Sequence, residues 1–138
     1  MIKHFTSSLS KFLSVVILFS LLSFVSRAQD IPEDATSITA GETLFNSNCK
    51  SCHKIHTESV GPPLAGIENR APSVEWIVRW VHNSSKVVAS GDEYGVAIFE
   101  KYKKSKMTDF TTLKDDQILS ILAYVKAEAN KPVETPAA

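Results

Sequence analysis

Asn48-Cys49-Lys50-Ser51-Cys52-His53-Lys54 is the stretch of this 138-residue chain that decides its fold. It holds both cysteines of the chain, three positions apart, with a histidine directly after the second. A Cys-x-x-Cys pair occurs in thioredoxin-like redox sites, in zinc sites and, when histidine follows, in haem attachment sites. A thioredoxin-like site needs a βαβ pattern and a zinc site a second ligand pair. The sequence shows no strand pattern for the first, and His56 and His82 do not form the ligand pair that the second needs.

The spacing of this motif suits a haem. Two thiols on one helical turn can each add to a vinyl group of the ring, and the imidazole of the next residue then points at the iron from the same side. We therefore predict one haem c, attached covalently through Cys49 and Cys52, with His53 as an iron ligand.

Met107 is the predicted iron ligand on the opposite face of the haem. It is the only methionine besides Met1, and its soft thioether favours ferrous iron. Without the haem motif, a lone methionine would be interpreted as core filler. His82 is the alternative ligand, although it could also be an ordinary histidine near a helix end.

Residues 1–28 are predicted to be a signal peptide or an N-terminal anchor. A basic start is followed by an apolar run over 12–25 and by small residues at Ser26 and Ala28, which suit signal peptidase. The run is shorter than the ~20 residues of a transmembrane helix. Cleavage before Gln29 predicts a periplasmic protein, and an uncleaved segment would anchor it to the membrane.

The composition of the remaining 110 residues allows one compact domain. Residues 1–28 hold three of the 15 basic side chains and none of the 15 acidic ones, so the formal charge moves from 0 to −3 on cleavage. A net charge of this sign does not indicate a nucleic-acid-binding protein.

Helical patterns fill the rest of the chain, and no stretch alternates apolar and polar residues as a half-buried strand does. The sequence thus predicts an all-α fold of about four short helices around one haem, with a long loop over 56–71 and a disordered tail over 131–138. The predicted helix starts are Thr39-Ala40-Gly41-Glu42, Pro72-Ser73, Ser90-Gly91-Asp92-Glu93 and Thr112-Leu113-Lys114-Asp115, and Pro132 ends the last helix.

Over residues 36–130 the chain resembles the class I monohaem cytochromes c. Gly61-Pro62-Pro63-Leu64 looks like the family's Gly-Pro-x-Leu loop, which implies that the Pro62 carbonyl accepts a hydrogen bond from the His53 ring and that Leu64 packs on the haem. The resemblance also implies that Gly41 and Phe45 cross the last helix near Tyr124.

Further site residues follow from the same resemblance. Arg70 would face a haem propionate, Trp80 or Trp76 would supply an indole N–H nearby, and Phe110 would line the haem. Each has an ordinary interpretation, a solvated loop charge for the arginine and core packing for the tryptophans. Many bacterial relatives have proline after the ligating methionine, whereas this chain has Thr108, which predicts a less rigid loop.

The function that the resemblance implies is single-electron transfer by a His/Met-ligated haem in a respiratory chain, without enzymatic activity. Its partners would be a quinol:cytochrome c reductase and a terminal oxidase. Two alternatives keep the haem: a membrane-anchored subunit of a respiratory complex, and a haem enzyme or gas sensor with a labile distal ligand. The lysines at 101, 103, 104 and 106, with Lys50 and Lys54, would ring the haem edge.

These inferences make a direct prediction about the purified protein. Mass spectrometry should find a mature chain beginning near Gln29 and heavier than its polypeptide by one haem. A colourless protein with the mass of the bare chain would refute the haem assignment, and a chain retaining residues 1–28 would indicate the anchor.

Overall fold

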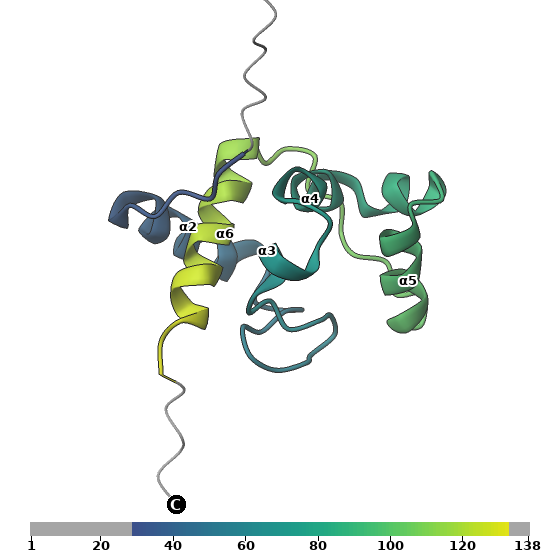
Figure 1. Cartoon of the computed structure of the whole chain (residues 1–138), viewed down its shortest axis with the longest axis horizontal. Helices are drawn as coiled ribbons and strands as arrows, with labels where there is room; N and C mark the ends of the chain where they lie inside the picture. Colours follow the sequence, from purple (N-terminus) through teal and green to yellow (C-terminus); the bar gives the residue numbers. More distant parts are fainter. Residues whose placement is uncertain (1–28, 133–138) are drawn as a thin grey trace, which may run out of the picture.

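A computed structural model describes residues 29–132, which form five α-helices and no strand (Figure 1). The all-α prediction is therefore confirmed, with one short helix inside the loop expected over 56–71. The predicted signal peptide, and the tail from residue 133, lie outside the described residues. No helix within 29–132 is long and apolar enough to span a membrane. The helices are α2 (Ala35–Asn48), α3 (Ile67–Arg70), α4 (Val74–Ala89), α5 (Glu93–Lys101) and α6 (Asp115–Ala129).

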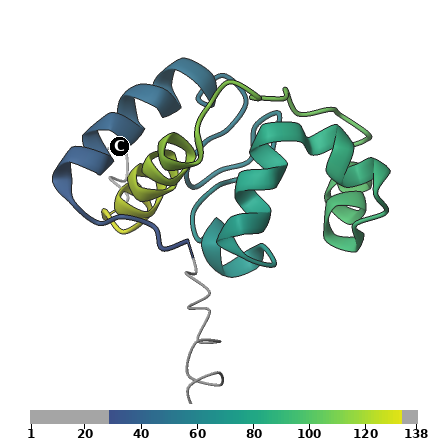
Figure 2. The same ribbon diagram turned by 90° about the horizontal axis from the view of Figure 1, so that it is seen from above.

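The crossing of α2 and α6 organises one half of the molecule (Figure 2). A Cβ atom on Gly41 would come within 1.8 Å of the Ser120 carbonyl oxygen, so only glycine allows this approach of the two backbones. One turn further on, the rings of Phe45 and Tyr124 pack with centroids 5.3 Å apart. The crossing lies where the family resemblance implied.

Helix α2 begins five residues earlier than predicted. Asp34 caps it by accepting a hydrogen bond from the Ser37 N–H at 2.9 Å, and Thr39 lies inside the helix with its hydroxyl donating to the Ala35 carbonyl at 2.9 Å. The predicted start at Thr39 was wrong because the aspartate already satisfies an N–H group of the first turn.

Helix α4 begins as predicted, with Ser73 accepting from the Trp76 N–H at 3.1 Å. Helix α5 is present, but its cap is Asp92, which accepts from the Gly95 N–H at 2.8 Å, and not Ser90. The serine hydroxyl instead donates to a carbonyl of the last turn of α4. A serine or aspartate near a helix boundary can serve either neighbouring helix, and only the backbone path decides which.

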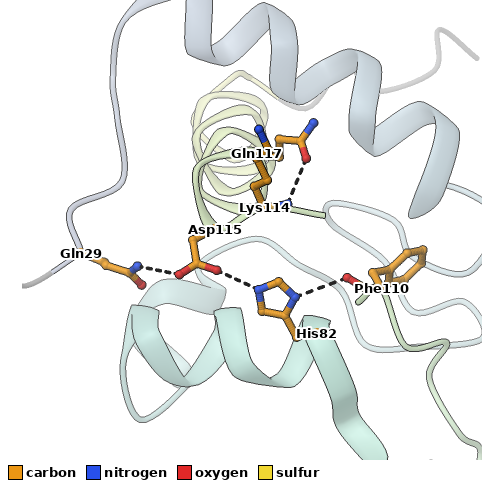
Figure 3. A network of polar contacts seen from close by, with 6 residues as sticks. All are labelled: Gln29, His82, Phe110, Lys114, Asp115 and Gln117. Atoms are coloured by element: carbon orange, nitrogen blue, oxygen red, sulfur yellow. Dashed lines mark hydrogen bonds and ion pairs between the residues drawn. The ribbon is translucent and has the colours of Figure 1, made fainter. Parts of the chain in front are cut away.

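Helix α6 also starts later than the predicted box at Thr112. Its cap is Lys114, whose N–H donates to the Gln117 side chain at 3.0 Å (Figure 3). The helix ends at Ala129, two residues before Lys131-Pro132.

Helix α4 is broken at Asn83, which the periodicity of its apolar residues did not predict. The backbone there has φ −159° and ψ 84°, and the side-chain oxygen of Asn83 accepts from the Lys86 N–H at 2.7 Å. Asn83 thus caps a second, shorter helical segment and changes the direction of the chain.

The core consists of apolar side chains from α2, α3, α4 and α6. Trp76 lies at its α4 side, stacked on Trp80 with centroids 5.1 Å apart and touched edge-on by Tyr94 of α5 at 5.0 Å. Gly95 lets α5 approach, because a Cβ atom there would lie 3.1 Å from the Trp80 ring. The buried apolar residues are Phe45, Ile67, Trp76, Ile77, Val78, Ile118, Ile121, Leu122, Ala123 and Val125.

The α2–α6 contact generates a stability prediction. Gly41→Ala should lower the free energy of unfolding by about 3 kcal/mol, because the new methyl group forces two backbones apart. The urea midpoint followed by far-ultraviolet circular dichroism measures this loss. Glu42→Ala, an exposed change on the same helix, is the control and should stay within about 0.5 kcal/mol of the wild type. A Gly41→Ala midpoint equal to that of the control would contradict the close approach.

Candidate haem-binding site

The two thiols and the imidazole lie on one tight turn at the end of α2. Cys49 is the residue that ends the helix, and its N–H donates to the Phe45 carbonyl at 2.8 Å. The Cys49 carbonyl then accepts from the N–H groups of Cys52 at 3.1 Å and His53 at 2.9 Å. Both cysteines are free of any disulfide. The turn therefore presents all three groups of the motif together, as haem attachment requires.

The loop after the motif holds the His53 ring. Its Nδ1 atom lies 3.0 Å from the Pro62 carbonyl oxygen, the contact that the family resemblance implied. Gly61 passes so close to the ring that a Cβ atom there would lie 2.4 Å from its Cε1 atom. The Gly61 N–H also donates to the Cys52 carbonyl at 2.9 Å. With Nδ1 bound to a carbonyl, Nε2 remains as the nitrogen that can bind iron.

The electrostatics of the pair argue against a reactive dithiol. Burial, followed by the influence of Cys52, raises the pKa of the Cys49 thiol to about 11. Catalytic cysteines of thioredoxin-like sites have lowered pKa values, because the thiolate is the nucleophile. Within residues 29–132 no group of three or more histidine, cysteine or acidic side chains could hold a metal ion, so the zinc alternative also lacks its ligands.

A largely apolar cavity opens in front of His53 and separates it from Met107. Leu64, Trp80 and Phe110, each predicted to contact the haem, line this cavity together with both predicted iron ligands. Seven of the ten buried apolar side chains line it as well, so a flat apolar ring placed there would complete the core. These seven are Ile67, Trp76, Ile77, Ile118, Ile121, Leu122 and Val125. The residues present therefore fit a haem.

The structure gives less support to the residues predicted to contact a haem propionate. The Trp76 indole N–H donates to Asp92 at 3.1 Å, which leaves Trp80 as the candidate of that pair for a propionate. The Arg70 guanidinium donates to the carbonyls of Pro63 at 2.6 Å and Ala65, and Arg70 is not among the residues lining the cavity. Its contact with a propionate stays a prediction.

His82, the alternative iron ligand, does not line the cavity. Its Nε2 atom lies 2.8 Å from an Asp115 carboxylate oxygen and its Nδ1 atom 3.3 Å from the Phe110 carbonyl oxygen, as Figure 3 shows. The hydrogen bond with His82 lowers the pKa of Asp115 below its ordinary value. Both ring nitrogens thus lie against protein acceptors and the residue itself does not line the cavity, which disfavours His82 as a ligand.

Helix α5 contributes cavity residues that the sequence did not single out. Ile98, Phe99 and Tyr102 line the cavity, and the Tyr102 hydroxyl donates to Glu58 of the His53 loop at 2.9 Å. The spacing of Phe99 and Tyr102 was a signal for one helical face. It did not reveal that this face turns toward the haem site, because that depends on the α4–α5 connection.

A helical fold that brings two thiols and an imidazole to one wall of an apolar cavity defines a protein with covalently attached haem c. The family model described as Cytochrome c matches residues 38–128. The chain therefore belongs to the cytochrome c family, and its single motif and fold make it a class I monohaem member. Its haem is bound through Cys49 and Cys52.

Solved structures agree with this assignment. A cytochrome c from Rhodothermus marinus is 27% identical, with 78% of this chain and 87% of that chain covered and a TM-score of 0.61. An engineered form of the Rhodothermus marinus cytochrome c is 26% identical, with 80% and 90% covered and a TM-score of 0.62. Another engineered form, bound to a carbene intermediate, is 25% identical over 80% and 90% of the two chains, with a TM-score of 0.60. No curated protein matches by sequence.

The close contact of Gly61 with the His53 ring generates a prediction for the haem-loaded protein. Gly61→Ala should displace the ring from the Pro62 carbonyl and weaken its bond to iron by about tenfold, the usual cost of losing such a supporting contact. The visible spectrum of the ferric protein in increasing urea measures this, and loss of ligation should occur at a lower urea concentration. Ser59→Ala, an exposed change in the same loop, is the control. Equal transitions in the two variants would contradict the role of Gly61.

Proposed function

We propose that this protein carries single electrons through a haem whose iron is held by His53 and Met107, and that it transforms no substrate. The observation that carries the proposal is that Met107 lines the same cavity as His53. It is the only methionine after residue 28, and the alternative ligand His82 lies outside the cavity. When bound, the haem supplies an iron that changes between the ferric and ferrous states by one electron.

The two ligands decide what the iron can do. His53 would donate through Nε2, with Nδ1 supported by the Pro62 carbonyl. A thioether ligand from Met107 would raise the reduction potential and would leave the iron no free position for a substrate. This geometry supports electron transfer over the haem enzyme or gas sensor, because those functions need a labile distal ligand and a distal acid or base.

The apolar cavity wall would keep water from the iron. Side chains from α4, α5 and α6 surround the space between the two ligands, and one of them, Ile118, is only 1% exposed. A low-dielectric surrounding disfavours the more highly charged ferric state, which raises the reduction potential further. The chain thus supplies rigidity and a dry environment, which an electron carrier needs in both redox states.

The surface near the cavity suits docking to a protein partner. Val60 lines the cavity and is 60% exposed, the only large hydrophobic residue so exposed in the described part of the chain. Lys101, Lys103, Lys104 and Lys106 on the Met107 side, with Lys50 and Lys54 beside the motif, are all exposed. A partner with an acidic face would be attracted to this surface. Two of these lysines are paired, Lys104 with Glu100 and Lys106 with Asp109, which reduces the positive charge of this surface.

We further propose a periplasmic location and a place in a respiratory chain, between a quinol:cytochrome c reductase and a terminal oxidase. The signal-peptide pattern of residues 1–28 supports secretion, and uncleaved residues 1–28 would make the protein membrane-anchored. The exposed lysines near the motif and near Met107 support protein partners for electron entry and exit.

Replacing the proposed distal ligand tests the function. Met107→Leu keeps the apolar volume and removes the sulfur, so the ferric protein should lose its weak sulfur-to-iron band in the red. The ferrous protein should gain carbon monoxide binding, and the reduction potential should fall by on the order of 100 mV. Thr111→Ala, an exposed change outside the cavity lining, is the control and should behave as the wild type.

Two results would contradict the proposal. A Met107→Leu spectrum identical to that of the wild type would mean that another residue binds the iron. Ready binding of carbon monoxide by the wild-type ferrous protein would favour the sensor or enzyme alternative.

A further inference from the structure

The segment that carries Met107 has no regular structure of its own. Residues 105–110 belong to neither helix nor strand. Among the described residues, no backbone group of 106–109 is hydrogen-bonded to another backbone group. A segment without such bonds is positioned by side-chain contacts and by its two ends. What holds the Met107 main chain must therefore come from a neighbouring element.

That contact comes from Ser84, in the shorter segment of α4. Ser84 is the only buried polar side chain in residues 29–132, with 3% of its surface exposed. Its hydroxyl donates to the Met107 carbonyl at 3.1 Å, and the Asp109 carboxylate lies 3.5 Å away as a second acceptor. A buried hydroxyl is retained in a core when it satisfies a partner, and here the partner is the main chain of the proposed iron ligand.

The break of α4 at Asn83 makes a second contact available. In a continuous helix the Val81 carbonyl would accept from the N–H four residues further on. Asn83 interrupts that ladder, and the Val81 carbonyl accepts the Phe110 N–H at 3.1 Å. The helix break therefore holds the Met107 segment at two points, the carbonyl of Met107 and the N–H of Phe110.

The same region touches α6 through His82. Its ring lies between the Phe110 carbonyl and Asp115, the first residue of α6, while the Gln29 side chain donates to the other Asp115 oxygen at 3.4 Å (Figure 3). A neutral imidazole has one N–H, so both contacts are hydrogen bonds at once only when the ring is protonated. The contacts of Ser84 and Val81 need no such protonation.

We propose that the break of α4 at Asn83 anchors the Met107 segment, and that Ser84 is a positioning residue that holds the methionine where its sulfur reaches the iron. The inference rests on the proposed function, because it takes Met107 as the distal ligand. Beyond that function, the inference identifies the broken helix α4 as the element that determines how firmly Met107 is held. Removal of the hydroxyl would leave the partly buried Met107 carbonyl without its donor and would allow the segment to open more often.

Competition by imidazole for the distal position tests the anchor. The full-length, haem-loaded Ser84→Ala variant is titrated with imidazole in the ferric state, and loss of the sulfur-to-iron band is followed. Imidazole should bind about tenfold more tightly than to the wild type, the effect of losing one hydrogen bond of ordinary strength. Ser85→Ala is the matched control, because the Ser85 hydroxyl makes no hydrogen bond within residues 29–132, and it should stay within about twofold of the wild type.

The outcomes separate this inference from the function on which it rests. Absence of the band in the wild-type protein would refute Met107 as the ligand, and with it the anchor. A normal wild-type band with equal imidazole affinity in the Ser84→Ala and wild-type proteins would refute the anchor alone. A lower urea midpoint for Ser84→Ala with unchanged imidazole affinity would have the same meaning, because it would show a purely structural role.

Amide hydrogen exchange on the wild-type protein gives a test that needs no variant. Saturating imidazole should speed exchange of the Phe110 N–H, which is bound to Val81, and leave that of Ile118 in α6 unchanged. An unchanged Phe110 rate would show that the methionine leaves the iron without releasing the anchor, which would overturn the proposal.

Discussion

The imidazole of His53 is held between the Gly61 backbone and the Pro62 carbonyl, and the rest of the structure depends on that constraint. With Nδ1 against the Pro62 carbonyl and Gly61 against the ring, Nε2 is the nitrogen left to hold the iron of a bound haem. The thiols of Cys49 and Cys52 lie on the same turn as His53 and attach the haem to the end of α2. The other elements supply the apolar side chains that would enclose the haem.

The hydrophobic core is arranged accordingly. Most of the buried apolar side chains face the cavity in front of His53, and few of them belong to helix–helix contacts alone. A domain of the size of residues 29–132 buries only roughly 65% of its unfolded surface, which leaves a modest core. Haem as the central apolar group compensates for this small size. The α2–α6 crossing is different, because these two helices pack directly against each other at Gly41.

The two sides of the haem site are built differently. On the His53 side, ligand, attachment points and supporting loop lie within Cys49–Pro62, so local backbone geometry positions them. On the other side, the proposed ligand Met107 belongs to an irregular segment whose contacts come from α4, about 23 residues earlier in the chain. The His53 ring is therefore positioned by its neighbours in sequence, whereas Met107, the proposed second ligand, depends on tertiary contacts.

The sequence alone determined the chemistry of the proximal side. Cys-x-x-Cys-His needs only one turn of backbone to present its three groups, and the apolar periodicity around it was sufficient to predict an all-α fold. The exact helix starts at Asp34 and Asp92, the break at Asn83 and the turning of Tyr102 toward the cavity were decided by the tertiary structure. Several polar residues near each boundary can cap a helix equally well, and the choice among them depends on where the packed helices direct the chain. Ser84 shows this most clearly, because a serine in a helical sequence is ordinary until the fold buries it against the carbonyl of Met107.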